Sequence, residues 1–213
     1  MSSAHFAALL NGMAWTVGLS LIAFAGGGVV GLAVALGRIA DAWPLRVLVG
    51  TYVALVQGTP VLILMFVLYF GLSIFGFDVP PLLAAGIAMT VYASAYLGEI
   101  WRGCLQAVPA KQWEAAECLG LSRVQRMRLV ILPQALRIAT PPTVGFMVQI
   151  VKSTSLASVI GLAEMTYIGK LINNSTFRPF VTYIVIAGLY FALCYPLSWW
   201  SKRLEKKLHV GHR

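Results

Sequence analysis

Helix-breaking and polar residues interrupt the apolar stretches of this chain, and they are the residues that could act on a substrate. Gln57-Gly58-Thr59-Pro60 lies inside one apolar stretch, and Pro141-Pro142 lies inside another. Glycine and proline weaken a helix and free backbone groups for other partners. In a bilayer such groups face protein or a water-filled path, because exposure to lipid is costly. Each break is therefore either a bend that neighbouring helices satisfy or part of a path for a polar substrate.

Charged and hydroxyl side chains follow the stretch that contains the two prolines. Lys152 begins a run with Ser153, Thr154 and Ser155. Lys152 could extend to the membrane surface or meet a carboxylate of a substrate or partner. Glu164, further on, is expected as a solvated surface charge, with a substrate ammonium group or a protein partner outside the membrane as the alternatives. The candidate pathway residues are Gln57, Gly58, Thr59, Pro60, Pro141, Pro142, Lys152, Thr154, Ser155 and Glu164.

Catalytic and cofactor-binding patterns are not found in the sequence. An intramembrane enzyme would need a pair such as serine with histidine or two aspartates, and the expected spans contain no His or Asp. Cys104, Cys118 and Cys194 have no metal-ligand spacing. The G-x-x-x-x-G-K-[ST] phosphate loop is absent. We therefore expect a non-catalytic chain that binds no cofactor or metal and does not hydrolyse ATP.

The elements that must position these residues are membrane-spanning helices. Of the 213 residues 59% are hydrophobic and 11% charged, whereas soluble domains have about 25% charged residues. Gly27 and Gly31 have the spacing that lets two helices approach closely, here most simply within the chain. The sequence therefore predicts an all-α integral membrane protein. Five spans of roughly 20 residues are expected at about 13–36, 52–75, 82–101, 131–151 and 181–200.

Basic residues set the expected orientation. The net charge is +9 at pH 7, and twelve of the sixteen basic residues fall on one side of the expected spans. The positive-inside rule places that side in the cytoplasm, with the N-terminus outside and the C-terminus inside. The net charge thus reflects topology and not a nucleic-acid surface. The twelve are Arg38, Arg46, Arg102, Lys111, Arg123, Arg126, Arg128, Lys202, Arg203, Lys206, Lys207 and Arg213.

A polar, helix-forming segment separates the third and fourth spans on the cytoplasmic side. It is either a basic amphipathic helix in the lipid headgroups or a helix that docks into a soluble partner. Its Glu114 is expected near the helix start, where it would suit the dipole. Ala115 and Ala116 would let another surface approach, and Gly120 is expected to end the helix. These features favour docking, with the headgroup anchor as the alternative.

The segment also resembles a known motif. Glu114-Ala115-Ala116, Gly120 and Val130-Ile131-Leu132-Pro133 resemble the EAA loop of the membrane subunits of ABC importers. The pieces "QGTPVLILMFVLYFGL", "ILPQALRIATPP" and "IVKSTSLASVIGLAEM" resemble the branch that transports polar amino acids. The resemblance covers roughly residues 12–205, followed by a basic cytoplasmic tail over 206–213.

The resemblance implies a type I ABC importer permease in a bacterial plasma (inner) membrane. Its coupling helix, about 111–122 with Glu114, Ala115, Ala116 and Gly120, would join two ABC ATPase subunits that bind ATP and Mg. A second permease, identical or related, would complete the pathway, and an extracytoplasmic binding protein would deliver an amino acid. Alternating access would move the substrate. A membrane scaffold or sensor that only binds an ATPase is the alternative.

Overall fold

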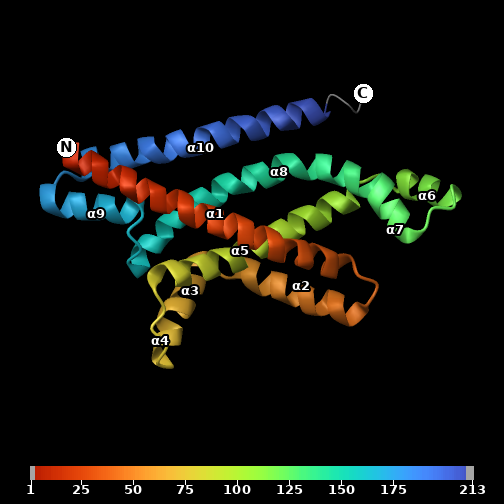
Figure 1. The fold of residues 1–213 in the computed structure, drawn as a ribbon, viewed down its shortest axis with the longest axis horizontal. Coiled ribbons are helices and arrows are strands. Elements are labelled where there is room, and N and C mark those ends of the chain that lie inside the picture. Colours follow the sequence, from red (N-terminus) through yellow and green to blue (C-terminus); the bar gives the residue numbers. More distant parts are fainter. Residues whose placement is uncertain (1–2, 210–213) are drawn as a thin grey trace.

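The computed structural model describes residues 3–209, and all of their regular secondary structure is helical. Figure 1 shows a long, flattened bundle in which α1 crosses α5 and α8. The short helices α6 and α7 lie at one end of the long axis, and α9 lies at the other. The helices are α1 (Ser3–Ile39), α2 (Trp43–Gly58), α3 (Val61–Phe66), α4 (Leu72–Ile74), α5 (Pro81–Gln106), α6 (Ala110–Cys118), α7 (Arg123–Arg126), α8 (Leu132–Ser153), α9 (Met165–Thr176) and α10 (Pro179–His209). Two π-helical turns, η1 (Val67–Gly71) and η2 (Met127–Ile131), and a 3₁₀ helix, η3 (Thr154–Ile160), complete the chain.

Four of the described helical segments are long and apolar enough to cross a membrane. They are α1, α5, the run over 123–160 and α10, and a fifth span results if the bent pair of α2 with 61–74 counts as one. The number of spans therefore agrees with the sequence-based prediction. α5 is the most buried of them and α10 the least. α10 continues through residue 209, so part of the expected basic tail is helical, and residues 210–213 lie outside the described region.

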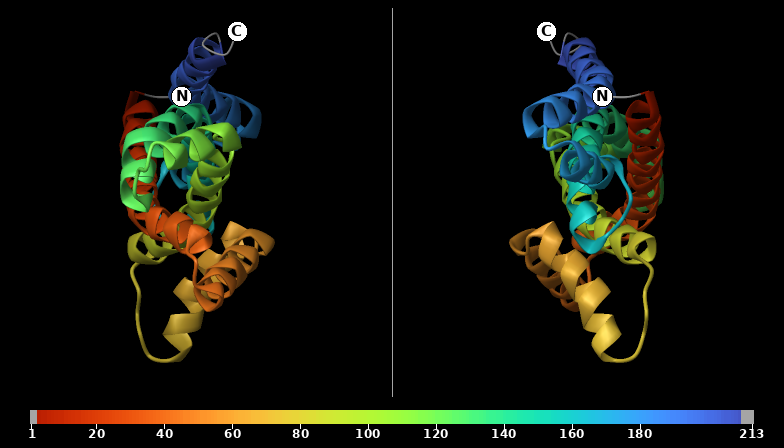
Figure 2. Two further views of the ribbon diagram at one scale, coloured as in Figure 1. Left: turned by 90° about the vertical axis from the view of Figure 1, so that its right-hand side faces the viewer. Right: turned by 90° about the vertical axis from the view of Figure 1, so that its left-hand side faces the viewer.

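The second expected span is not one helix over 52–75. It begins earlier, at Trp43, and bends by 100° between Gly58 and Val61. Pro60 has no N–H for a helical bond, and its ring disfavours helical geometry at Thr59. Thr59 accordingly has extended backbone angles, with φ −107° and ψ 129°. Figure 2 shows the chain turning away from the direction of α2 as a result, with α4 at the far end of this segment.

Small residues bring α1 and α5 into close contact. A methyl group at Gly27 would overlap the Ala93 side chain, and one at Gly98 would overlap Val34. At Gly31 it would lie 3.1 Å from the Ser94 carbonyl oxygen. The expected intramolecular use of the Gly27 and Gly31 spacing is confirmed. This contact makes α1 and α5 the frame on which the other helices pack.

The main apolar core surrounds α5. Leu19 of α1, Met65 of α3, and Met89 and Leu97 of α5 are fully buried, and Ile150 of α8 is nearly so. A second core at the end that carries α6 contains Leu105, Val108, Ile131 and Ala135, with Trp113 packed against it. One continuous helix, α5, therefore reaches from the middle of the bundle to the end that carries α6.

Candidate functional site

The break between α2 and α3 opens onto a pocket of about 430 Å³. All four residues of Gln57-Gly58-Thr59-Pro60 line it. The side chain of Gln57 donates a long hydrogen bond of 3.5 Å to the carbonyl of Ala95 on α5. Thr59 donates from its hydroxyl to the Leu55 carbonyl at 2.8 Å, which satisfies one free acceptor at the end of α2. The other lining residues are Val61, Leu62, Tyr92, Tyr96, Gln149, Ser153 and Leu156.

Aromatic rings form one wall of this pocket. Tyr92 and Tyr96 are one helical turn apart on α5, and their ring centres are 4.6 Å apart. Tyr96 stacks on Phe146 of α8 at 5.5 Å, with an angle of 13° between the ring planes. Tyrosine faces attract cations, and amides such as Gln57 and Gln149 both donate and accept hydrogen bonds. The wall and the amides together suit a small polar molecule.

Sequence reasoning missed the tyrosines and Gln149 as pocket residues. The available signals were two tyrosines at i and i+4 in the alanine- and glycine-rich α5 and a glutamine inside the apolar part of α8. Neither signal shows that the residues meet the Gln57–Pro60 break. Only the 100° bend brings them to one place.

Two helix ends of opposite polarity meet at the break. The last carbonyl groups of a helix have no partner inside it, and at the end of α2 they include those of Gln57 and Gly58. The first N–H groups are similarly left over, and at the start of the next helix they belong to Val61 and Leu62. The first end attracts positive charge and the second attracts negative charge. All four residues line the pocket, which therefore favours a molecule that carries both charges.

Pro141 and Pro142 do not break α8. The helix continues through them to Ser153, so the prediction of a break there is wrong. Ser201 of α10 donates a hydrogen bond of 2.9 Å to the Pro141 carbonyl, which joins α10 to α8 here. Neither proline lines the pocket at the α2 break. Their observed contacts belong to the packing of α8 on α10.

The hydroxyl groups that follow Lys152 mostly turn back to their own helix. Thr154 is fully buried and donates to the Val151 carbonyl at 2.8 Å. Ser155 donates to the Lys152 carbonyl at 2.7 Å. Lys152 itself is exposed. Of this run only Ser153 lines the pocket.

Glu164 is fully buried, so its expected place as a solvated surface charge is wrong. One carboxylate oxygen accepts the Tyr167 N–H at 2.9 Å and caps α9. The other accepts the Tyr190 hydroxyl at 2.9 Å and the Thr16 hydroxyl at 3.4 Å. Burial raises the pKa of this carboxyl above its usual range, against the effect of these hydrogen bonds. Glu164 thus joins α9 to α1 and α10, and it does not line the pocket at the break.

The polar segment between the third and fourth spans contains a short helix with a well-formed end. Gly120 has a φ of 72°, and its N–H bonds the Glu117 carbonyl at 2.9 Å. The Leu121 N–H bonds the Ala116 carbonyl at 3.2 Å. Together these bonds form a Schellman motif, so the expected helix stop at Gly120 is confirmed. The helix ends at Cys118, earlier than the expected 122.

Two details of this helix differ from the sequence-based prediction. α6 begins at Ala110, so Glu114 lies beyond the first turn, where the dipole effect has faded. Glu114 and Ala115 are exposed, but Ala116 is only 2% exposed and faces the chain itself. The surface available to a partner is therefore carried by Glu114 and Ala115 and not by both alanines.

Ion pairs connect this end of the molecule. Glu99 of α5 binds Arg102 at 2.7 Å, as the i, i+3 spacing predicts, and also Arg38 of α1 at 2.8 Å. Among residues 3–209 no group of three His, Cys, Asp or Glu residues could hold a metal.

Comparisons with known proteins place the chain clearly. The family described as "Binding-protein-dependent transport system inner membrane component" matches residues 27–210. A probable glutamine ABC transporter permease protein of Bacillus subtilis (strain 168), GlnM, is 37% identical over 98% of this chain and 96% of its own length. A probable amino-acid ABC transporter permease protein of the same organism, YckA, is 35% identical over 95% and 89%.

Solved structures agree with this fold. A chain from "Crystal structure of an amino acid ABC transporter with histidines" has a TM-score of 0.91 and 32% identity, over 95% of this chain and 94% of that one. A chain of the MetNI methionine ABC transporter in an inward-facing conformation has a TM-score of 0.82 over 98% and 99%. At 22% identity, this second likeness concerns the fold alone.

Proposed function

This chain belongs to the family of binding-protein-dependent transport system inner membrane components, and we propose that it is the permease subunit of an ATP-driven amino acid importer. The bent α2–α3 pair and its pocket are the single observation that carries the proposal. Polar groups inside an apolar helix bundle are costly, and passage of a polar solute would explain why this pocket has them. The names of the relatives supply the class of solute, an amino acid.

The chemistry of the pocket suits the backbone groups that all α-amino acids share. A free amino acid carries an ammonium and a carboxylate on one carbon. The C-terminal end of α2 and the rings of Tyr92 and Tyr96 would hold the ammonium. The N–H groups at Val61 and Leu62 would hold the carboxylate. The amides of Gln57 and Gln149 remain for the side chain of the substrate.

Energy would come from separate ATPase subunits. In this proposal α6 docks into an ABC ATPase through Glu114 and Ala115, and ATP with Mg stays on that partner. An extracytoplasmic binding protein delivers the amino acid, and a second permease, identical or related, completes the path. The N-terminus lies outside the bacterial inner membrane and the C-terminus in the cytoplasm, as the basic residues predict.

The decisive test is uptake by the complete transporter in proteoliposomes. The chain is reconstituted with its ATPase and binding protein, and entry of radiolabelled amino acids is measured with and without ATP. We expect ATP-dependent uptake that falls by about tenfold or more in Tyr96→Ala or Gln149→Ala, since each loses a polar or ring contact worth about one hydrogen bond. Tyr183→Ala, an exposed tyrosine on α10, is the matched control.

Two results would overturn the proposal. ATP hydrolysis that responds to the binding protein without any movement of amino acid would favour a sensor or scaffold. Uptake that is unchanged in both pocket variants would place the path elsewhere in the bundle. A normal yield of the complete complex shows that the variants fold.

A further inference from the structure

A second and larger pocket lies at the end of the bundle that carries α6 and α7. Its volume is about 600 Å³. It is enclosed by the end of α1, the start of α2, the end of α5 and the segment from α6 to η2. Ile39, Leu105, Trp113 and Met127 contribute apolar surface to it. The proposed transport path runs through the pocket at the α2 break, and it does not explain why this second pocket exists.

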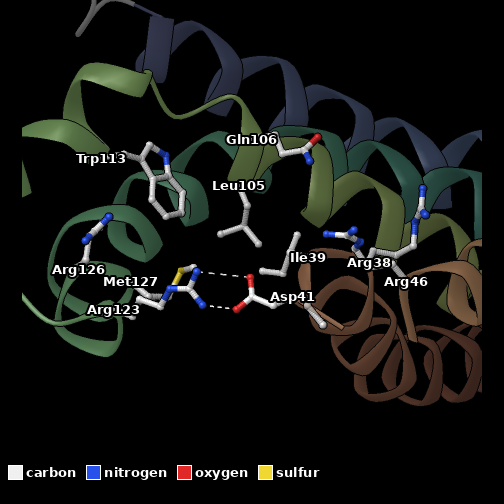
Figure 3. Close-up of a pocket in the computed structure, with 11 residues that line it drawn as sticks. Arg38, Ile39, Asp41, Arg46, Leu105, Gln106, Trp113, Arg123, Arg126 and Met127 are labelled. Carbon is white, nitrogen blue, oxygen red and sulfur yellow. Dashed lines mark hydrogen bonds and ion pairs between the residues drawn. The ribbon is translucent and has the colours of Figure 1, made fainter. Parts of the chain in front are cut away.

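Arginine is the dominant polar residue of this pocket. Figure 3 shows Arg38 and Arg46 on one side and Arg123 and Arg126 on the other, with Asp41 between them. Asp41 is the only acid among the eleven lining residues. A pocket lined in this way attracts anions.

The one acid in the pocket is already neutralised. Arg123 forms an ion pair with Asp41 through both carboxylate oxygens. The hydrogen bond and the charge of Arg123 hold the pKa of Asp41 below its usual range. Asp41 therefore stays ionised, with Arg123 as its ion-pair partner and Arg46 as a second, weaker electrostatic neighbour.

The remaining arginines are not fully matched by acids. Glu99 is shared between Arg38 and Arg102. Arg126 pairs through one nitrogen with the exposed Glu117 at 3.2 Å, and its buried Nε atom has no hydrogen-bond partner. Arg46 takes part in none of the ion pairs among the described residues. The four lining arginines and Arg102 thus share three carboxylates, those of Asp41, Glu99 and Glu117. Two positive charges remain around this pocket.

The position of the pocket indicates what kind of anion reaches it. It adjoins the start of α2, where Trp43 and Leu48 are 67% and 69% exposed. Tryptophan at the end of a spanning helix marks the headgroup level of a membrane. Anionic lipids carry phosphate at that level. The planar guanidinium group of arginine matches two phosphate oxygens at once.

We propose that the pocket between Arg38, Arg46, Arg123 and Arg126 binds a phosphate-bearing anion. The headgroup of an anionic phospholipid and a free phosphate compound in the cytoplasm share this chemistry and are the two sources to be separated. The site is separate from the pocket at the α2 break, because the two share no lining residue. An anion bound there would attract both walls of the pocket and so hold the α6–α7 segment to α1 and α2.

Native mass spectrometry of the complete transporter tests the site directly. Complexes are extracted in mild detergent and mixed with phosphatidylglycerol or with phosphatidylcholine of the same acyl chains. We expect the wild-type complex to retain phosphatidylglycerol preferentially. Arg46→Gln should weaken this retention by about tenfold, as the loss of one charge-assisted hydrogen bond implies. Arg46→Lys keeps the charge and should retain part of it.

A matched control removes the same charge nearby. Arg128 is exposed on η2 and does not line the pocket, so Arg128→Gln should leave retention unchanged. Because Arg46 is in none of the ion pairs of the described residues, its substitution breaks no ion pair there. An unchanged yield and mass of the complex confirm that each variant folds.

Inorganic phosphate distinguishes the two sources. If phosphate binds the wild-type complex and Arg46→Gln loses this binding while no lipid is preferred, the anion is a free phosphate compound. If phosphatidylglycerol is preferred and only an excess of phosphate displaces it, the source is the lipid headgroup. Equal retention in the Arg46→Gln and Arg128→Gln complexes, with no phosphate binding, would overturn the proposal.

Discussion

At the scale of single residues, Glu164 is the least expected feature of the chain. It lies between two helices in the sequence, which is where a solvated charge is normally found. Its hydroxyl partners, Thr16 and Tyr190, are 148 and 26 residues away. No local pattern predicts such a meeting. The carboxylate therefore serves as a polar connection inside the bundle, which sequence reasoning alone could not have assigned.

If Glu164 connects these helices, its substitution should lower the free energy of unfolding. Glu164→Ala removes the acceptor of the Tyr167 N–H and leaves the Tyr190 hydroxyl with only the Thr166 hydroxyl, at 3.2 Å. This should cost about 1–3 kcal/mol in the free energy of unfolding. Glu164→Gln keeps an acceptor and should cost less. Thermal unfolding of the purified protein in detergent measures both. Asp78→Asn, at an exposed acid, is the control, and an equal effect at both positions would contradict the connection.

The same residue should make stability depend on pH. Because burial raises the pKa of Glu164 in the folded protein above 4.5, the folded state holds this proton more tightly than the unfolded state. The contribution of Glu164 to stability is therefore complete below pH 4.5, and it falls as the pH rises through the pKa of the folded state. The difference between wild type and Glu164→Gln should follow that fall. A difference that stays constant with pH would show that the carboxyl pKa is not raised.

At the scale of elements, local sequence signals predicted helix ends better than helix breaks. Gly120 ends α6 because only a glycine easily adopts its left-handed backbone. Pro60 and Pro141 have the same local chemistry, yet α2 ends before Pro60 and α8 continues through Pro141. The missing N–H of a proline alone therefore does not decide whether a membrane helix breaks.

The contact between α1 and α5 offers a test with a control in the same helix. Gly27→Ala would overlap the Ala93 side chain, and such overpacking typically costs about 1–3 kcal/mol. Gly18 has no neighbour within 4 Å of an added Cβ. Gly18→Ala should therefore gain about 0.5–1 kcal/mol from helix propensity. Unfolding by heat or denaturant in detergent should rank Gly27→Ala below wild type and Gly18→Ala above it.

Two adjacent alanines of α6 should separate docking from folding. Ala115 is exposed and Ala116 is 2% exposed. Ala115→Arg should leave the chain stable and remove the ATPase from the purified complex. Ala116→Arg should instead lower the stability of the chain, because a long cation is forced into its packed side. Co-purification and thermal unfolding of both variants measure this. A stable Ala115→Arg chain that keeps its ATPase would show that the partner docks elsewhere.

At the scale of the whole molecule, α5 and α8 connect the two regions of interest. Tyr96 lines the pocket at the α2 break, and Leu105 packs in the core beside α6. Nine residues of one helix separate them, which is about 13 Å at 1.5 Å per residue. α8 likewise contributes Gln149 to the pocket. Ile131, the residue just before α8, packs in the core beside α6. A displacement of α6 can therefore reach the pocket through helices that move as rigid bodies.

This view predicts what happens when the α6–α7 segment is tied to the α1–α2 connection. Asp41 and Arg123 already join the two through an exposed ion pair, which is too weak to prevent movement. Cysteines at both positions, in a chain whose Cys104, Cys118 and Cys194 are replaced by serine, would allow a bismaleimide to make the link covalent. If ATP-driven motion of α6 relative to α1 opens the path, the cross-link should abolish uptake and leave the complex assembled. The same protein treated with a single-headed maleimide should transport normally, whereas full uptake by the cross-linked protein would mean that α6, α7 and α1 move as one body.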